Sequence, residues 1–150
     1  MKKYSKEDIM MFAKFVRKQS EGFNYLHENK LKELMATLEA IRDEKKAFKY
    51  LIDNKHFELA AFVNSIWDDE KAFKFLIDVK AFDWAACSNI INGDDSAIEA
   101  LKRAGKEHYI DLAYAIQNVI REDGDRNVSP IGIIKNMFNF KKMFGKDEDN

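Results

Sequence analysis

Hydrophobic residues recur in this chain in short blocks that follow helical spacing. Counting from Leu59, apolar residues fall at i, i+1, i+4 and i+7, which places them on one face of a helix. A shorter block, residues 47–52, has apolar residues at i, i+1, i+4 and i+5. Residues 53–55 between these blocks are the turn formers Asp, Asn and Lys. The pattern predicts pairs of short helices joined by tight turns.

These blocks repeat along the sequence with a period of about 25 residues. Residues 43–53 read DEKKAFKYLID, and residues 68–78 read DDEKAFKFLID. The longer block also recurs, in residues 30–41, 55–66, 80–91 and, after a slightly longer step, 109–120. Because short helices are only marginally stable alone, stacking between hairpins must stabilise them. We therefore predict an all-α fold: a short right-handed α-solenoid or array of antiparallel helical hairpins, with capping helices at both ends.

The first segment of the chain departs from the repeat. Residues 4–19 predict a separate amphipathic cap helix, with Ser5 as its N-cap and Asp8 in the capping-box position. Gly22 is expected to end this helix. Residues 1–122 are therefore expected to form one helical-repeat domain.

The last segment reads as a linker followed by another helix. Residues 123–129 are the predicted linker, and residues 130–144 are the predicted C-terminal amphipathic helix, which begins with Pro130 at its first position. Residues 145–150 are expected to be disordered. This helix is open to three interpretations: it caps the last hairpin, it docks on a partner or a second copy, or it lies on a membrane surface. Its candidate partner-binding residues are Ile134, Met137, Phe138 and Phe144.

Composition narrows the classes of partner. The net charge is −1, so the chain lacks the basic excess typical of nucleic-acid-binding domains. The sequence shows no secretory signal and no continuous apolar stretch long enough for a transmembrane helix, so we expect no membrane span. The single cysteine, Cys87, lies in an apolar run and is expected to be a buried hydrophobic residue. A cytoplasmic location is the resulting expectation.

A search for catalytic or metal-binding motifs gives no convincing candidate. The sequence has no Gly-rich phosphate loop, no GxSxG and no HExxH. Residues 123–127 begin like an EF-hand loop, but Val128 and Ile134 stand where that loop needs Gly and Glu. The three histidines do not share a repeat position. Acidic residues recur at the starts of the longer helices, where the helix dipole favours them: Glu33, Glu58, Asp83 and Asp111. We therefore expect no catalytic residue, no metal and no cofactor.

A recognition surface remains as the functional candidate. Asn64, Asn89 and Gln117 occupy one aligned position, where stacked amides either line a ligand groove or close the packing between layers. The sequence favours a non-enzymatic protein–protein interaction module, with the partner unknown. The alternatives are a nucleic-acid-associated helical repeat with lysines on one side, and an enzyme whose site is assembled across hairpins.

Overall fold

The structure is a computed structural model that describes residues 2–125. Every regular element among these residues is a helix, which confirms the all-α prediction. The helices are α1 (Lys6–Val16), α2 (Ser20–Glu28), α3 (Lys32–Ile41), α4 (Lys45–Asp53), α5 (Phe57–Ile66), α6 (Glu70–Asp78), α7 (Phe82–Ile91), the short 3-10 helix η1 (Asp95–Ala97), α8 (Ile98–Arg103) and α9 (Glu107–Asp125).

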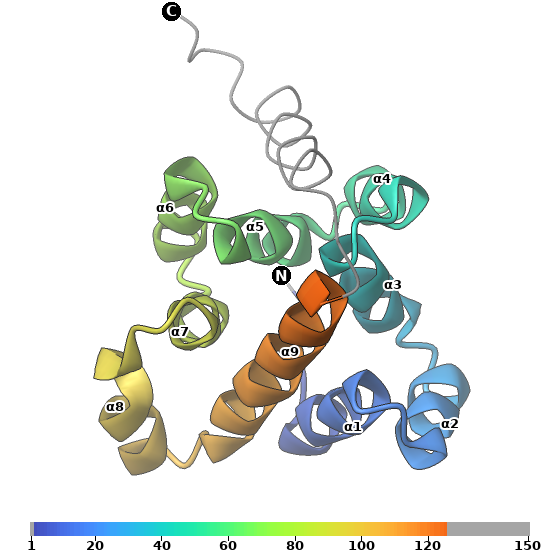
Figure 1. Ribbon diagram of the computed structural model, residues 1–150, viewed down its shortest axis with the longest axis horizontal. Coiled ribbons are helices and arrows are strands. Elements are labelled where there is room, and N and C mark those ends of the chain that lie inside the picture. The colour runs from blue at the N-terminus through green and yellow to red at the C-terminus, as the bar shows by residue number, and fades with distance from the viewer. Residues whose placement is uncertain (1, 126–150) are drawn as a thin grey trace, which may run out of the picture.

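The helices form antiparallel pairs around a central helix (Figure 1). Helices α1, α3, α5 and α7 lie inside, and α2, α4, α6 and α8 lie at the periphery. Helix α9 crosses the middle and packs against both α1 and α7, so the first and last helices of the array touch each other. The hairpins are therefore stacked as predicted for a helical array, and α9 closes the stack against its own beginning. The right-handed solenoid form stays a prediction.

The turns between helices share one backbone design. After each of the first eight α-helices, one residue adopts the left-handed conformation with φ between 57° and 94°. At each such turn the left-handed residue donates its N–H three residues back, and the next residue donates five residues back, which is the Schellman motif. The left-handed residues are Lys18, Lys30, Asp43, Lys55, Asp68, Lys80, Gly93 and Gly105. Only two of the eight are glycine, although the left-handed region disfavours residues with a Cβ.

This series of turns also gives the period of the structure. Lys18, Asp43, Asp68 and Gly93 are evenly spaced, at the interval of the sequence repeat, and a second series with the same spacing starts at Lys30 and reaches Gly105. The last step therefore has the same length as the others, whereas the sequence alignment made that step longer. The difference arises because α9 is long. Its apolar residues can be aligned with those of the earlier helices either at the true start of α9 or about one helical turn further along.

One continuous apolar core joins the inner helices. Its largest fully buried side chains include Phe12 of α1, Phe62 of α5 and Ile116 of α9. Cys87 of α7 is also completely buried, as the sequence predicted. Burial raises the pKa of its thiol far above the usual range, so the thiolate does not form near neutral pH.

The prediction that Gly22 ends the first helix is wrong. Helix α1 ends at Val16, and Gly22 lies inside α2, where it is buried against α1. A Cβ added to Gly22 would lie 2.3 Å from the backbone N of Phe15 and 2.6 Å from the carbonyl O of Met11. Glycine is needed here because the two helices cross at very close range. The capping box at Ser5 is confirmed, with the Ser5 side chain accepting from the N–H of Asp8 at 3.0 Å.

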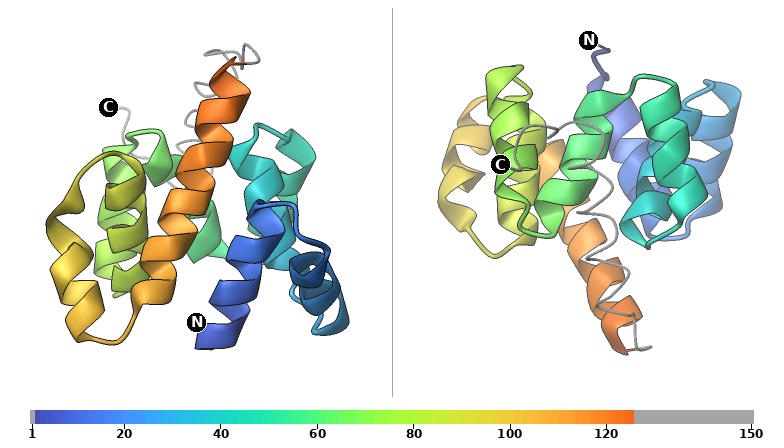
Figure 2. Two further views of the ribbon diagram at one scale, coloured as in Figure 1. Left: turned by 60° about the horizontal axis from the view of Figure 1, so that its bottom comes forward. Right: turned by 90° about the horizontal axis from the view of Figure 1, so that it is seen from above.

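Two charged pairs fasten α9 to the front of the array. Arg17 donates from both terminal nitrogens to the Asp111 carboxylate at 2.9 Å, and Arg42 binds Asp123 at 2.9 and 3.1 Å. Both are bidentate Arg–carboxylate pairs, which fix orientation better than single contacts. Beyond Asp123, α9 continues to Asp125 and extends past the ends of the other helices (Figure 2). The predicted linker thus begins where α9 is still helical, and the predicted helix 130–144 lies outside the described residues.

Within residues 2–125, no helix is long and apolar enough to cross a membrane.

Candidate functional site

One end of the array presents a row of lysines. The turns before α5, α7 and α9 lie at the same end because these inner helices are separated by antiparallel partners. Lys55 and Lys80 are the left-handed residues of two of these turns, and Lys106 follows Gly105 in the third. The opposite end carries carboxylates at the corresponding turns, including Asp43, Asp68 and Asp94. We call the end with Lys55, Lys80 and Lys106 the basic edge and the end with Asp43, Asp68 and Asp94 the acidic edge, although each edge also carries some charges of the opposite sign.

A pocket opens at the basic edge. Its volume is about 440 Å³, which is within the range of ordinary ligand-binding pockets. The turns before α5, α7 and α9 form three of its sides, and the N-terminal segment Lys2–Tyr4 crosses it. The charged residues that line it are Lys2, Lys3, Lys55, Lys80, Lys106, Glu58 and Asp83. Five cations against two carboxylates leave the lining positive.

Three of these lysines have no counter-ion among the described residues. Lys2 and Lys106 are paired, with Glu33 at 2.7 Å and with Asp83 at 2.9 Å. In contrast, Lys3, Lys55 and Lys80 are exposed and make no salt bridge or hydrogen bond to any residue in 2–125. Their charges face solvent at the mouth of a concave site, where an anion gains the most from them.

Aromatic rings form the inner wall of the pocket. Trp84 packs edge-on against Tyr4 at 6.3 Å and against Tyr109 at 5.4 Å between ring centroids. Phe62 supports Trp84 from the core at 4.8 Å. At the mouth, the side chain of Phe82 is 54% exposed, which is unusual for phenylalanine. The pocket thus combines a fixed aromatic wall with an exposed aromatic ring and exposed lysines.

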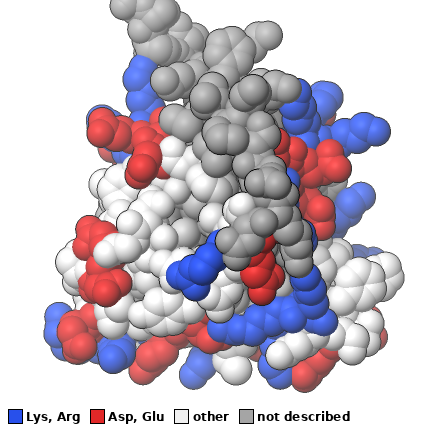
Figure 3. Space-filling view, in the orientation of Figure 1, with Lys and Arg blue, Asp and Glu red and all other residues white. Residues whose placement is uncertain are grey.

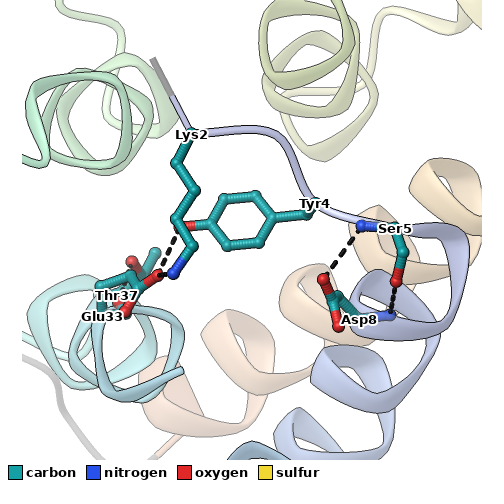
Figure 4. Close-up of polar contacts among 6 residues, drawn as sticks. All are labelled: Lys2, Tyr4, Ser5, Asp8, Glu33 and Thr37. Atoms are coloured by element: carbon teal, nitrogen blue, oxygen red, sulfur yellow. Dashed lines mark hydrogen bonds and ion pairs between the residues drawn. The ribbon is translucent and has the colours of Figure 1, made fainter. Parts of the chain in front are cut away.

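The N-terminal segment is held in place by a buried carboxylate (Figure 4). Lys2 Nζ and the Tyr4 hydroxyl donate to the same oxygen of Glu33, at 2.7 and 2.8 Å. Glu33 is only 3% exposed, and burial alone would raise its pKa, but the hydrogen bonds from Lys2 and Tyr4 outweigh burial and lower the pKa. Burial, together with the bond to Glu33, raises the pKa of Tyr4, so this hydroxyl stays protonated. The segment is therefore a fixed wall of the pocket.

Two helix N-termini beside the pocket lack capping side chains. The N-cap residues of α5 and α7 are His56 and Ala81, and neither makes a side-chain capping bond. The outer helix α6, in contrast, is capped by Asp69, whose carboxylate accepts from two backbone N–H groups. Uncapped N–H groups and the positive end of the helix dipole both favour an acidic group nearby. These helix ends add to the attraction that Lys3, Lys55 and Lys80 exert on an anion.

The pocket histidines do not form a catalytic pair with the described residues. His56 stacks on Tyr50 at 6.2 Å, and the His108 ring lies 5.0 Å from Tyr109. Burial first, and then nearby Lys6, lower the pKa of His108, which keeps it neutral at pH 7. No hydrogen bond joins either histidine to a carboxylate or hydroxyl of residues 2–125. In the same range, no three His, Cys, Asp or Glu side chains lie close enough together to hold a metal ion.

The amide residues predicted to line a groove occupy three different settings. Asn64 is completely buried, and neither its side-chain N nor its O has a partner within residues 2–125. Asn89 is half-buried on α7. Gln117 donates to the carbonyls of Ile90 and Ile91 at 3.4 and 3.2 Å, so it joins α9 to α7. The other candidate residues, Ile134, Met137, Phe138 and Phe144, lie outside the described residues.

The recurring acidic residues are dispersed among separate partners. Glu33 binds Lys2 and Tyr4, Asp83 binds Lys106, and Asp111 binds Arg17, while Glu58 faces the pocket. Their common position at helix starts matches the helix-dipole interpretation. Sequence reasoning missed the pocket itself, although the recurrence of lysine at one repeat position, Lys55 and Lys80, was a visible signal for it.

In the orientation of Figure 1, blue and red side chains alternate around most of the visible rim, and a short blue stretch lies below the middle of the face (Figure 3). Several of these charges pair within a helix, for example Lys49 with Asp53 at 2.7 Å.

Comparison of the chain with protein-family models, with curated proteins and with solved structures finds no match in any of the three.

Proposed function

We propose that the protein is a non-enzymatic interaction module that binds an acidic, aromatic-bearing segment of another protein in the pocket at its basic edge. The observation that carries this proposal is the placement of Lys3, Lys55 and Lys80, unpaired among the described residues, around the aromatic wall at Trp84. The lysines select carboxylates, and the wall accepts a ring or another apolar group. We place this activity in the cytoplasm, consistent with a reduced and buried Cys87.

A protein ligand fits the charge pattern better than a nucleic acid does. The carboxylates of Glu58 and Asp83 also line the pocket, and they would repel a run of phosphates. The turns at the opposite edge carry Asp43, Asp68 and Asp94, and the chain as a whole has a net charge of −1. A short peptide needs only two or three cations and one apolar contact, which is what the pocket offers.

The test uses a fluorescein-labelled peptide, Glu-Glu-Phe-Glu-Glu, and fluorescence anisotropy with the full chain. Substituting Lys3, Lys55 and Lys80 by Gln should weaken binding about 10- to 100-fold, because each partly desolvated charge contact contributes about 0.5–1 kcal/mol. The matched control substitutes three lysines at the opposite end of the helices, namely Lys18, Lys46 and Lys71. Lys18 shares the left-handed turn conformation of Lys55 and Lys80, so the control also changes a residue of that kind.

Two further ligands make the experiment decisive. A peptide with Gln in place of Glu tests charge, and one with Ala in place of Phe tests the aromatic contact; both should bind more weakly. A labelled single-stranded dT12 oligonucleotide tests the other class of ligand. Tighter binding of the oligonucleotide, lost in the pocket variant, would replace this proposal with the nucleic-acid function. Equal peptide binding by pocket and control variants would refute the pocket as the site.

A further inference from the structure

We propose that the chain carries a ligand for its own pocket: the acidic segment 147–149, with Phe144 shortly before it, docks at the basic edge of the same molecule. This inference rests on the proposed function, because it assumes that the pocket takes acidic segments. Residues 144–149 read FGKDED and lie outside the described residues. Their chemistry comes from the sequence, and the pocket that receives them comes from the structure.

The composition of this segment matches the pocket. It supplies three carboxylates for the three lysines that are unpaired among the described residues, Lys3, Lys55 and Lys80. Phe144 supplies the ring, three residues before the first carboxylate, a separation of about 10 Å in an extended chain. Lys146 is the one opposing charge in the segment.

Another run of three acidic residues exists, but it is already used in the fold. Residues 68–70 form the turn into α6, where Asp69 is 3% exposed and caps that helix. That run lies at the acidic edge, at the far end of the helices from the pocket. The run 68–70 thus already serves as the turn into α6. This leaves the segment 147–149 as the candidate ligand for the pocket.

The chain length permits the contact within one molecule. The pocket is lined by the start of α9 at Tyr109, and Asp125 lies further along the same helix, about 24 Å away at about 1.5 Å per residue. Residues 126–146 number 21. With the predicted helix 130–144 at about 1.5 Å per residue and the other six residues extended at about 3.3 Å each, they reach up to about 40 Å, which exceeds the required distance. A tether that reaches its site over so short a distance gives an effective concentration near the millimolar range.

Such a contact would compete with an acidic segment of a partner. For a tethered ligand at about 1 mM effective concentration and an intrinsic affinity of about 0.1–1 mM, the apparent affinity of an outside peptide falls about 2- to 10-fold. The partner must therefore bind tightly enough to displace the chain's own segment.

The test compares three full-length proteins for their affinity toward the labelled Glu-Glu-Phe-Glu-Glu peptide. The first is unchanged, the second carries D147N, E148Q and D149N, and the third is a charge-matched control with D68N, E70Q and D95N at the acidic edge. We expect the second protein to bind the peptide about 2- to 10-fold more tightly than the first, and the third to bind like the first. Circular dichroism checks that all three are equally folded.

The outcomes separate the two proposals. Equal affinity in all three proteins overturns the intramolecular contact and leaves the proposed function standing. Absence of peptide binding in all three overturns both. Sedimentation analysis over a wide range of protein concentration distinguishes the source of the segment: monomers throughout support docking within one molecule, and dimers that the D147N, E148Q and D149N substitutions abolish overturn it in favour of exchange between copies.

Discussion

Replacing a left-handed turn residue by glycine should stabilise the protein. The backbone conformation at that position alone determines the direction of this effect. Lys30 has φ 57° and is exposed, and its side chain forms no salt bridge with any residue in 2–125. An L-residue in this region is disfavoured by about 1–2 kcal/mol relative to glycine. Glycine also loses about 0.4–1 kcal/mol more on folding, because its unfolded chain is freer. Substituting Lys30 by Gly should therefore raise the free energy of unfolding by about 0.5–1 kcal/mol.

The assay is urea unfolding, monitored by far-ultraviolet circular dichroism. The difference in urea midpoint is converted to a difference in the free energy of unfolding with one m-value common to all variants. Lys18→Gly should behave like Lys30→Gly, and because these turns are far apart the double variant should show the sum. Two controls carry the opposite sign. Lys49→Gly lies inside α4, where glycine lowers helix stability by about 1 kcal/mol. Gly105→Ala places a Cβ at φ 72°, which should lower stability by a similar amount.

A loss of stability in Lys30→Gly equal to that in Lys49→Gly would contradict this interpretation, because it would mean that residue 30 continues a helix. Stabilisation by Lys30→Gly, together with destabilisation by Lys49→Gly and by Gly105→Ala, tests whether the chain turns where the structure places the turns.

Further predictions concern the core and the buried carboxylate. Gly22→Ala should lower the free energy of unfolding by at least about 2 kcal/mol, since the added methyl meets the backbone of α1; a neutral effect in thermal unfolding would contradict the close helix crossing. Glu33→Gln should destabilise the protein by about 1–3 kcal/mol at pH 7. Because the folded-state pKa of Glu33 is lowered, its stabilisation is present above the ordinary pKa of 4.5 and is lost as pH falls through the folded-state pKa, so the variant should lose less stability between pH 5 and pH 3 than the parent. Cys87 should react with a thiol reagent only on the timescale of global unfolding, and fast labelling in native buffer would show that it is not buried.

Much of the helical framework can be predicted from the sequence. Apolar spacing and the regular repeat identify the hairpins from residue 30 onward, because each helix must bury one face against its neighbours. The first hairpin is missed because Gly22 resembles a helix terminator, whereas here it permits a close crossing. A signal was present: Phe23 and Leu26 each stand one repeat before Phe48 and Leu51.

The pocket is harder to predict, because its parts come from turns that periodicity does not bring together. The shared repeat position of Lys55 and Lys80 places them on one edge, but it says nothing of Lys3. The N-terminal segment reaches the pocket only because Tyr4 binds Glu33 and because α9 packs against α1. Both contacts join elements far apart in the sequence, and no local pattern encodes them.

The pocket can be tested at residue level by an amide chemical-shift titration of the full-length protein with the Glu-Glu-Phe-Glu-Glu peptide. Binding at the pocket should move the amide signals at the starts of α5, α7 and α9, namely residues 55–59, 80–84 and 106–109, more than any others. The Trp84 indole signal should move with them, because its ring forms the aromatic wall. Shifts confined to the acidic edge, at residues 42–44 and 67–70, or an absence of shifts at millimolar peptide, would contradict the assignment of the pocket as a binding site.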